Sequence, residues 1–158
     1  MSDRWVFLAA FLTAVLVVAG VFAIPQFFVY ELLTSTIFIV VAVMVFFGDD
    51  KFPYMLGMVA PILWYIFMVL TGEFFGNLGV LFRFFAGRAM RPLDTPLHGF
   101  SILASVLLIA VSAYAWRKQV TEKFFGSSFA KALVVALVWI ALMAVWQFHM
   151  ISAGVRAQ

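Results

Sequence analysis

The last third of the chain constrains its fold most strongly. Residues 97–116 and 132–151 are two apolar runs of about 20 residues, and a short basic segment, 117–131, separates them. With a rise of about 1.5 Å per residue, each run forms a helix that crosses the roughly 30 Å hydrocarbon core of a bilayer. The pattern therefore predicts a transmembrane helical hairpin.

Composition also favours a membrane protein. Of the 158 residues, 66% are hydrophobic and only 11% are charged, whereas soluble domains carry about 25% charged residues. So few charges cannot cover a water-facing surface, and lipid must therefore surround most of the chain. The chain has no cysteine, which excludes iron–sulfur clusters and thiolate zinc sites. The net charge of +3 fits interfacial Lys and Arg, and we expect no nucleic-acid partner.

Three further apolar runs precede the hairpin, at residues 5–24, 27–47 and 52–71. The second run is rich in β-branched residues, but an open strand cannot satisfy its backbone in lipid, so we expect a helix. The segment 73–88 has helical periodicity and is too short to span, which predicts an interfacial helix or, alternatively, a re-entrant segment. The expected fold is an all-α polytopic transmembrane bundle with five spans, in a single membrane domain over 1–158.

Five spans place the two ends of the chain on opposite sides of the membrane. The side of the N-terminus holds six Lys and Arg, and the other side holds four. This bias favours a cytoplasmic N-terminus, although the arginines around 73–88 favour the opposite orientation. We expect an integral protein of a bacterial inner membrane with its N-terminus in the cytoplasm. A cleaved signal peptide is the alternative for 5–24, but this run is long for a signal.

Acidic residues and both histidines gather on the membrane face opposite the 117–131 turn. The candidate site residues on this face are Glu31, Glu73, Asp94, His98 and His149. All five together suit a divalent metal, and His98 and His149, on adjacent helices at equal depth, suit the two axial positions of a haem. Alternatively, they are ordinary polar residues at helix ends.

Glu31 has two interpretations of its own, because it lies about one turn inside the second span. A carboxylate at this depth can carry protons or bind an ion. We expect instead that it pairs with Arg88 or Arg91, because a Glu so close to the head groups need not be desolvated. Tyr65 lies near mid-depth in the third span, where its hydroxyl needs a hydrogen-bond partner.

Aromatic residues make up 18% of the chain, including 20 Phe. Those near the span ends are typical of an interfacial belt, and the alternative is a surface for a flat ligand such as quinone, carotenoid or chlorophyll. Small residues line one face of two spans and predict helix–helix contacts. These are Ser101 and Ser105 in the fourth span and Ser128, Ala132 and Ala136 in the fifth.

The function that these observations favour is that of a non-catalytic integral subunit of a larger membrane complex of respiratory, photosynthetic or transport type. Such a subunit would contribute helix packing and a surface for an apolar cofactor or lipid. Its expected partners are membrane lipids and other membrane subunits or a second copy of itself. One alternative is a small membrane enzyme or redox protein with a metal or haem at the five-residue face. The other is a small transporter or channel, which usually needs more polar residues at mid-span.

Overall fold

The computed structural model describes residues 2–23, 27–48, 51–91, 94–121 and 123–152. The helices in this part of the chain are α1 (Ser2–Ala23), α2 (Phe28–Phe47), α3 (Phe52–Thr71), α4 (Glu73–Phe85), α5 (Leu97–Gln119) and α6 (Ser127–Ser152). All but α4 are long and apolar enough to cross a membrane. The prediction of an all-α bundle with five spans is therefore confirmed.

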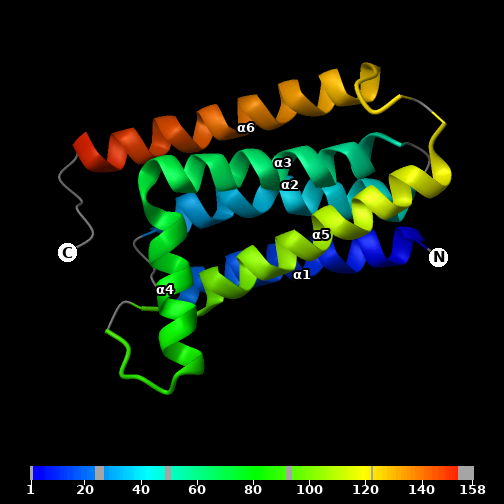
Figure 1. The fold of residues 1–158 in the computed structure, drawn as a ribbon. Coiled ribbons are helices and arrows are strands. Elements are labelled where there is room, and N and C mark those ends of the chain that lie inside the picture. Colours follow the sequence, from blue (N-terminus) through cyan, green and yellow to red (C-terminus); the bar gives the residue numbers. More distant parts are fainter. Residues whose placement is uncertain (1, 24–26, 49–50, 92–93, 122, 153–158) are drawn as a thin grey trace.

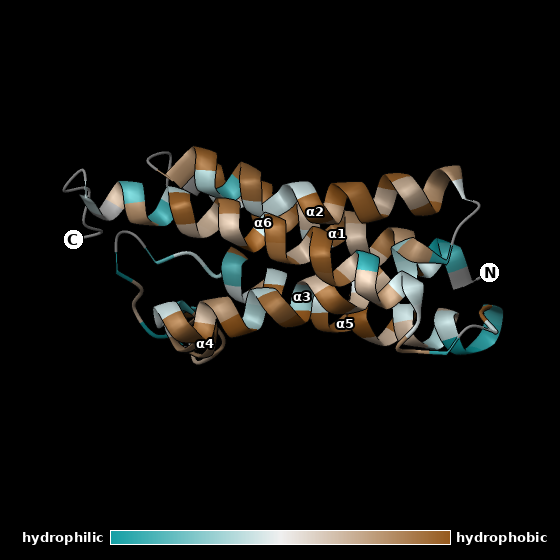
Figure 2. Cartoon of the chain, turned by 90° about the horizontal axis from the view of Figure 1, so that it is seen from above, coloured by the Kyte–Doolittle hydropathy of each residue, from teal (hydrophilic) through white to brown (hydrophobic). Residues whose placement is uncertain are grey.

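The five long helices run alongside one another, and α4 crosses one end of the bundle (Figure 1). Apolar residues dominate the length of the long helices, whereas hydrophilic residues lie mostly towards the two ends (Figure 2). This distribution matches a bilayer whose hydrocarbon surrounds the middle of the bundle. In that frame α4 crosses the end of the bundle, which is the placement expected of an interfacial helix.

The helix ends differ from the predicted bounds where local backbone chemistry decides them. The helix α4 ends at Phe85 and not at residue 88, because Gly87 adopts a left-handed conformation with φ of +62°. The helix α6 begins at Ser127, five residues before the apolar run, and α5 continues to Gln119. A helix can continue through polar residues outside the hydrocarbon. The predicted ends at residues 116 and 132, which follow the limits of the apolar runs, are therefore wrong. Residue 24, the predicted end of the first span, lies outside the described residues.

The two helices of the predicted hairpin are joined by a short connection but do not pack on each other. Among the described residues, α3 contacts both α5 and α6, and no contact joins α5 to α6. The helix α1 packs on α2 and α5. The small-residue faces are buried inside the bundle, as predicted. The prediction that Tyr65 needs a partner is also confirmed, because its hydroxyl donates to the Ile102 carbonyl at 3.0 Å and lies 2.6 Å from Ser105 Oγ.

A polar contact links three spans at the end of the bundle opposite α4. One carboxylate oxygen of Asp3, on α1, accepts hydrogen bonds from the Tyr54 hydroxyl at 2.7 Å and from Gln119 Nε2 at 2.8 Å. These side chains come from α3 and α5. The contact ties the N-terminal helix to the rest of the bundle.

Two glycines determine where α4 lies. Gly72 adopts φ of +80°, a conformation that costs glycine little, and it ends α3 so that the chain turns directly into α4. Gly99, near the start of α5, faces α4 at close range. A Cβ at Gly99 would lie 2.7 Å from the Leu81 Cβ and 3.2 Å from the Asn77 carbonyl oxygen. The absence of a side chain therefore allows α4 to pack directly on α5.

Candidate functional site

A cavity of about 390 Å³ lies where α4 crosses the end of the bundle. Its walls come from α2, α3, α4 and α5 and from the segments next to them. They include acidic, basic, aromatic and aliphatic side chains. The lining residues are Phe27, Tyr30, Glu31, Thr34, Trp64, Met68, Glu73, Gly76, Asn77, Val80, Arg83, Arg91, Asp94, Thr95 and His98.

A buried pair of side chains forms one wall of this cavity. His98 Nε2, on the first turn of α5, lies 2.6 Å from Glu31 Oε1, on the first turn of α2. Glu31 is only 6% exposed. The pair is a charge-assisted hydrogen bond when the proton resides on the imidazole, and this interaction compensates for the loss of water around both groups.

A glycine of α1 makes room for this pair. A Cβ at Gly20 would lie 3.0 Å from His98 Nε2 and 3.8 Å from the Glu31 carboxyl carbon. Even an alanine would require the imidazole to move by a few tenths of an ångström. Three helices, α1, α2 and α5, therefore meet at the pair, and each contributes one residue to it.

Glu73, the first residue of α4, lies on another wall of the cavity. Its two carboxylate oxygens accept hydrogen bonds from the Tyr30 hydroxyl at 3.3 Å and from Gln147 Nε2 at 2.7 Å. Burial raises the pKa of Glu73, and the nearby Glu31 carboxylate raises it further. The hydrogen bond from Tyr30, the charge of His98 and the hydrogen bond from Gln147 lower this pKa and offset part of the increase. Glu73 thus connects α4 to both α2 and α6.

An ion pair lies between α4 and the segment that leads into α5. Arg83 Nη2 donates to Asp94 Oδ2 at 2.8 Å, and the backbone N–H of Arg91 donates to the same oxygen at 3.1 Å. Asp94 therefore holds the chain after α4 against α4 itself. Exposed arginines such as Arg91 fit this position, because head groups and water surround the end of the bundle.

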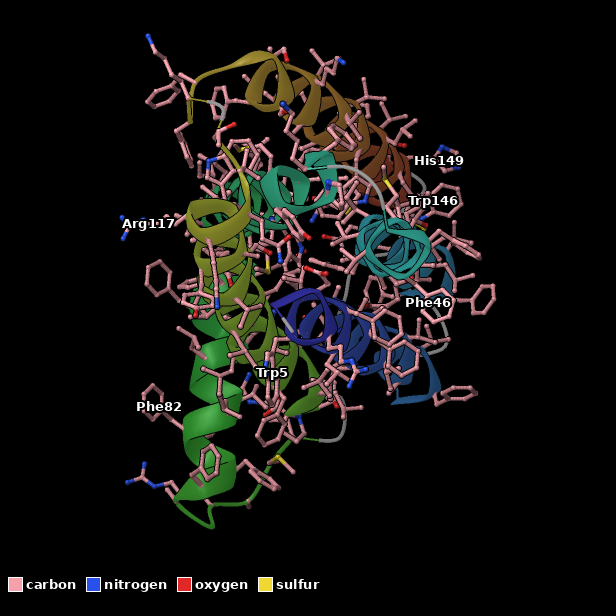
Figure 3. All side chains as sticks on the ribbon, turned by 90° about the vertical axis from the view of Figure 1, so that its right-hand side faces the viewer. Trp5, Phe46, Phe82, Arg117, Trp146 and His149 are labelled. Carbon is pink, nitrogen blue, oxygen red and sulfur yellow. The ribbon has the colours of Figure 1, made fainter. Side chains whose placement is uncertain are left out.

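The structure brings together four of the five predicted site residues. Glu31, Glu73, Asp94 and His98 all line the cavity. His149 does not line it. Its side chain is exposed, lies next to the Trp146 ring at a centroid distance of 5.9 Å, and points away from the bundle (Figure 3).

The geometry differs from the predicted metal and haem arrangements. Among the described residues, no three His, Asp or Glu side chains lie close enough together to hold a metal ion. The two histidines do not face one common space, because His98 lines the cavity and contacts Glu31, whereas His149 points away from the bundle (Figure 3). The expected pairing of Glu31 with Arg88 or Arg91 is wrong, because Glu31 is buried and its partner is His98.

Sequence reasoning did not select Trp64 and Gly20 for this site. Trp64 lies near mid-depth of the third span, and no charged residue next to it in the sequence marks it. Gly20 is one of several small residues in α1, and its role depends on the imidazole of another helix. Helical spacing within one segment carries no signal for either residue.

Comparison with protein-family models, with curated proteins and with solved structures finds no match to this chain.

Proposed function

We propose that this protein is an integral membrane subunit that holds an amphipathic small molecule in the cavity beneath α4. The observation that carries the proposal is the composition of the cavity wall. Charged groups, including Arg83 and Arg91, come from α4 and the segment after it, whereas Trp64, Met68 and Val80 form an apolar wall. A molecule with a polar head and an apolar tail matches both parts. The volume of about 390 Å³ lies within the usual range of ligand pockets.

The polar lining supports a binding role over a purely structural one. Ionisable groups are costly inside a membrane, and they usually mark a ligand, an ion or a proton. Here Glu31 and His98 are buried at the wall of an open space. Packing alone does not require such a pair, because apolar side chains would fill the same volume without a desolvation cost.

The outer surface of the bundle supports a role as a subunit. The longest connection between helices is 86–96, so little of the chain extends beyond the membrane. The helix α6 is the least enclosed span and carries a broad apolar face, which suits contact with lipid, another membrane protein or a second copy of the chain. A bacterial inner membrane and a cytoplasmic N-terminus remain part of this proposal.

Two glycines of α4 provide a matched test. A side chain added at Gly76, which lines the cavity, or at Gly79, which does not, would meet no atom within 4 Å at its Cβ. We expect protein purified in mild detergent to retain an amphipathic molecule in defined stoichiometry by native mass spectrometry. Gly76→Phe should lose the molecule, whereas Gly79→Phe should keep it. Equal retention by both variants would contradict the proposal.

The subunit role has a separate test. Gentle extraction followed by native electrophoresis should give a species larger than one copy of the chain. Tandem mass spectrometry of that species would then identify other membrane proteins or further copies. A monomer that persists under the mildest conditions that extract the protein would contradict the subunit role without affecting the cavity.

A further inference from the structure

We infer that the molecule held in the cavity has an anionic, phosphate-bearing head group, which Arg83 and Arg91 bind. The inference rests on the proposed function and specifies the class of its ligand. It depends on how the charged side chains of the cavity are already paired, and on which of their polar atoms still lack a partner.

The acidic side chains that line the cavity already have hydrogen-bond donors. These pairs are Glu31 with His98, Asp94 with Arg83, and Glu73 with Tyr30 and Gln147. Burial also raises the pKa of Glu73, which favours the neutral form of its carboxyl group. In the described lining, a cationic head group would therefore find no carboxylate without a donor.

The arginines of the cavity are less completely paired. The Arg91 guanidinium has no acidic partner among the described residues, and only the backbone N–H of this residue contacts Asp94. Arg83 uses Nη2 for its hydrogen bond to Asp94, whereas its Nε is buried without a hydrogen-bond partner in the described structure. A buried donor without an acceptor costs free energy. The wall therefore lacks acceptors and not donors, which favours an anion.

A phosphate group matches these two side chains. Guanidinium groups donate in a planar fork that fits phosphate oxygens, and such charge-assisted hydrogen bonds are strong. Arg83 lies on α4, and Arg91 follows after the turn at Gly87, so the two donors come from separate segments. Because a phosphate has several oxygens, one can accept from the buried Nε and another from Arg91.

The position of the arginines favours a lipid as the source of the phosphate. The helix α4 crosses the end of the bundle, which is the level expected for lipid head groups (Figure 1). Phe75, Phe82 and Phe85 are exposed on this helix, and such side chains suit the boundary between head groups and hydrocarbon. A lipid phosphate lies at the same level as the arginines, and its acyl chains suit the surrounding hydrocarbon.

Two lipids with the same acyl chains identify the head group. Purified protein in mild detergent would be incubated with dioleoylphosphatidylglycerol, which is anionic, or with dioleoylphosphatidylcholine, whose choline compensates the phosphate charge. Native mass spectrometry would record the lipid retained by each chain over a range of lipid concentrations. We expect the wild type to retain phosphatidylglycerol several-fold more strongly. Gly76→Phe, which blocks the cavity, should lose this preference.

Two arginines provide a matched test of the assigned contact. Arg91→Gln removes a guanidinium from the cavity, and we expect about tenfold weaker phosphatidylglycerol binding, as for the loss of one charge-assisted hydrogen bond. Arg88→Gln makes the same change at an exposed position that does not line the cavity, and it should bind as the wild type does. Equal losses in the two variants would assign the preference to general attraction by basic residues and would overturn the contact.

Arg83→Lys tests the buried Nε separately. Lysine keeps the positive charge that pairs with Asp94 but has no atom equivalent to Nε. We expect phosphatidylglycerol binding to weaken several-fold. Thermal stability without added lipid should change little, because the variant loses a donor that has no partner in the described structure. Unchanged binding would overturn the assignment of Nε to the head group.

The outcomes separate this inference from the function on which it rests. A preference for phosphatidylglycerol that Arg91→Gln and Gly76→Phe both weaken supports both. If the wild type retains the two lipids equally and Gly76→Phe loses both, the anionic head group is wrong and amphipathic binding stands.

A titration with inorganic phosphate distinguishes the lipid from the free ion. Binding of inorganic phosphate that Arg91→Gln weakens, without retention of either lipid, would contradict the lipid and with it the proposed function. If neither phosphate nor lipid binds and no molecule is retained on purification, both are wrong.

Discussion

Glu31 and His98 are costly residues to bury in this protein, because lipid surrounds the helices that carry them. Each compensates for the desolvation of the other through one short hydrogen bond of 2.6 Å. Because Gly20 on α1 has no side chain, it leaves room for the His98 imidazole to approach Glu31. One contact therefore depends on three residues from three separate segments.

The energetic coupling of this pair can be measured with a double-mutant cycle. Glu31→Ala or His98→Ala leaves one buried polar group without its partner, and each should lower the free energy of unfolding by about 1–3 kcal/mol. The double variant should lose less than the sum of the two, because no group remains unpaired. Unfolding in mixed micelles with increasing denaturing detergent would report these changes. Additive losses would show that the two side chains do not interact.

Glu73 predicts a pH dependence of stability. Its pKa is raised above the usual 4.5, chiefly by burial, so the folded protein holds this proton more tightly than the unfolded chain. The free energy of unfolding should therefore fall as pH rises from about 4.5 through the raised pKa. Glu73→Gln should remove this part of the slope, because it has no charge to desolvate. Thermal unfolding across this pH range would show it.

The comparison at low pH provides the control. There Glu73 is protonated in both states, so wild type and Glu73→Gln should be similarly stable. The other ionisable groups that face Glu73 are Tyr30, Glu31 and His98, and they are unchanged in the variant. Parallel profiles for the two proteins would assign the pH dependence to one of these groups instead.

At the scale of the elements, the position of α4 determines whether the cavity exists. The helix meets α5 at Gly99, where a Cβ would overlap Leu81. Gly99→Val should therefore push α4 away and cost about 1–3 kcal/mol of stability, as overpacking usually does. Ligand retention should fall with it. Thermal unfolding and native mass spectrometry would measure the two effects.

Gly79→Ala is the matched control for this change. It adds a methyl group on α4 itself, at a position where no atom lies within 4 Å of the added Cβ. Because alanine favours helix over glycine by about 1 kcal/mol, stability should stay equal or rise slightly. Similar losses for both variants would show that the loss does not arise from the close contact between Gly99 of α5 and Leu81 of α4.

The contact between α3 and α5 has a similar glycine. A Cβ at Gly57 would lie 2.6 Å from Ser112 Oγ, a buried atom without a hydrogen-bond partner in the described structure. Gly57→Ala should therefore cost about 1–3 kcal/mol. Adding Ser112→Ala removes the overlapping oxygen and should restore most of the loss, because the remaining Ser112 Cβ lies at an ordinary 3.5 Å. Failure of this rescue in thermal unfolding would place the strain elsewhere.

At the scale of the whole molecule, five spans require that the two ends of the bundle face opposite sides of the membrane. The natural absence of cysteine allows this to be tested with single introduced thiols. With a cytoplasmic N-terminus, Arg88→Cys should react with a membrane-impermeant maleimide in intact cells. Lys123→Cys, in the connection between α5 and α6, should react only after the cells are opened. The reverse pattern would invert the orientation.

The sequence by itself determined the class of fold. Apolar runs of membrane length define the five spans, because lipid leaves a helix as the main way to satisfy the backbone of such a run. The same polarity placed Glu31, Glu73, Asp94 and His98 at one end of the bundle. These are properties of single segments, and hydropathy along the chain is enough to predict them.

The tertiary structure alone decided which of these groups meet. Two residues near the same end of the bundle can face the same cavity, as Glu31 and His98 do, or one can point away from the bundle, as His149 does. The difference arises from helix neighbours and rotations, and α3 lies between the two helices that the sequence suggested would pair. These helix neighbours and rotations follow from close packing at positions such as Gly20 and Gly99. The residue that each glycine contacts belongs to another segment, so the sequence around the glycine does not predict the contact.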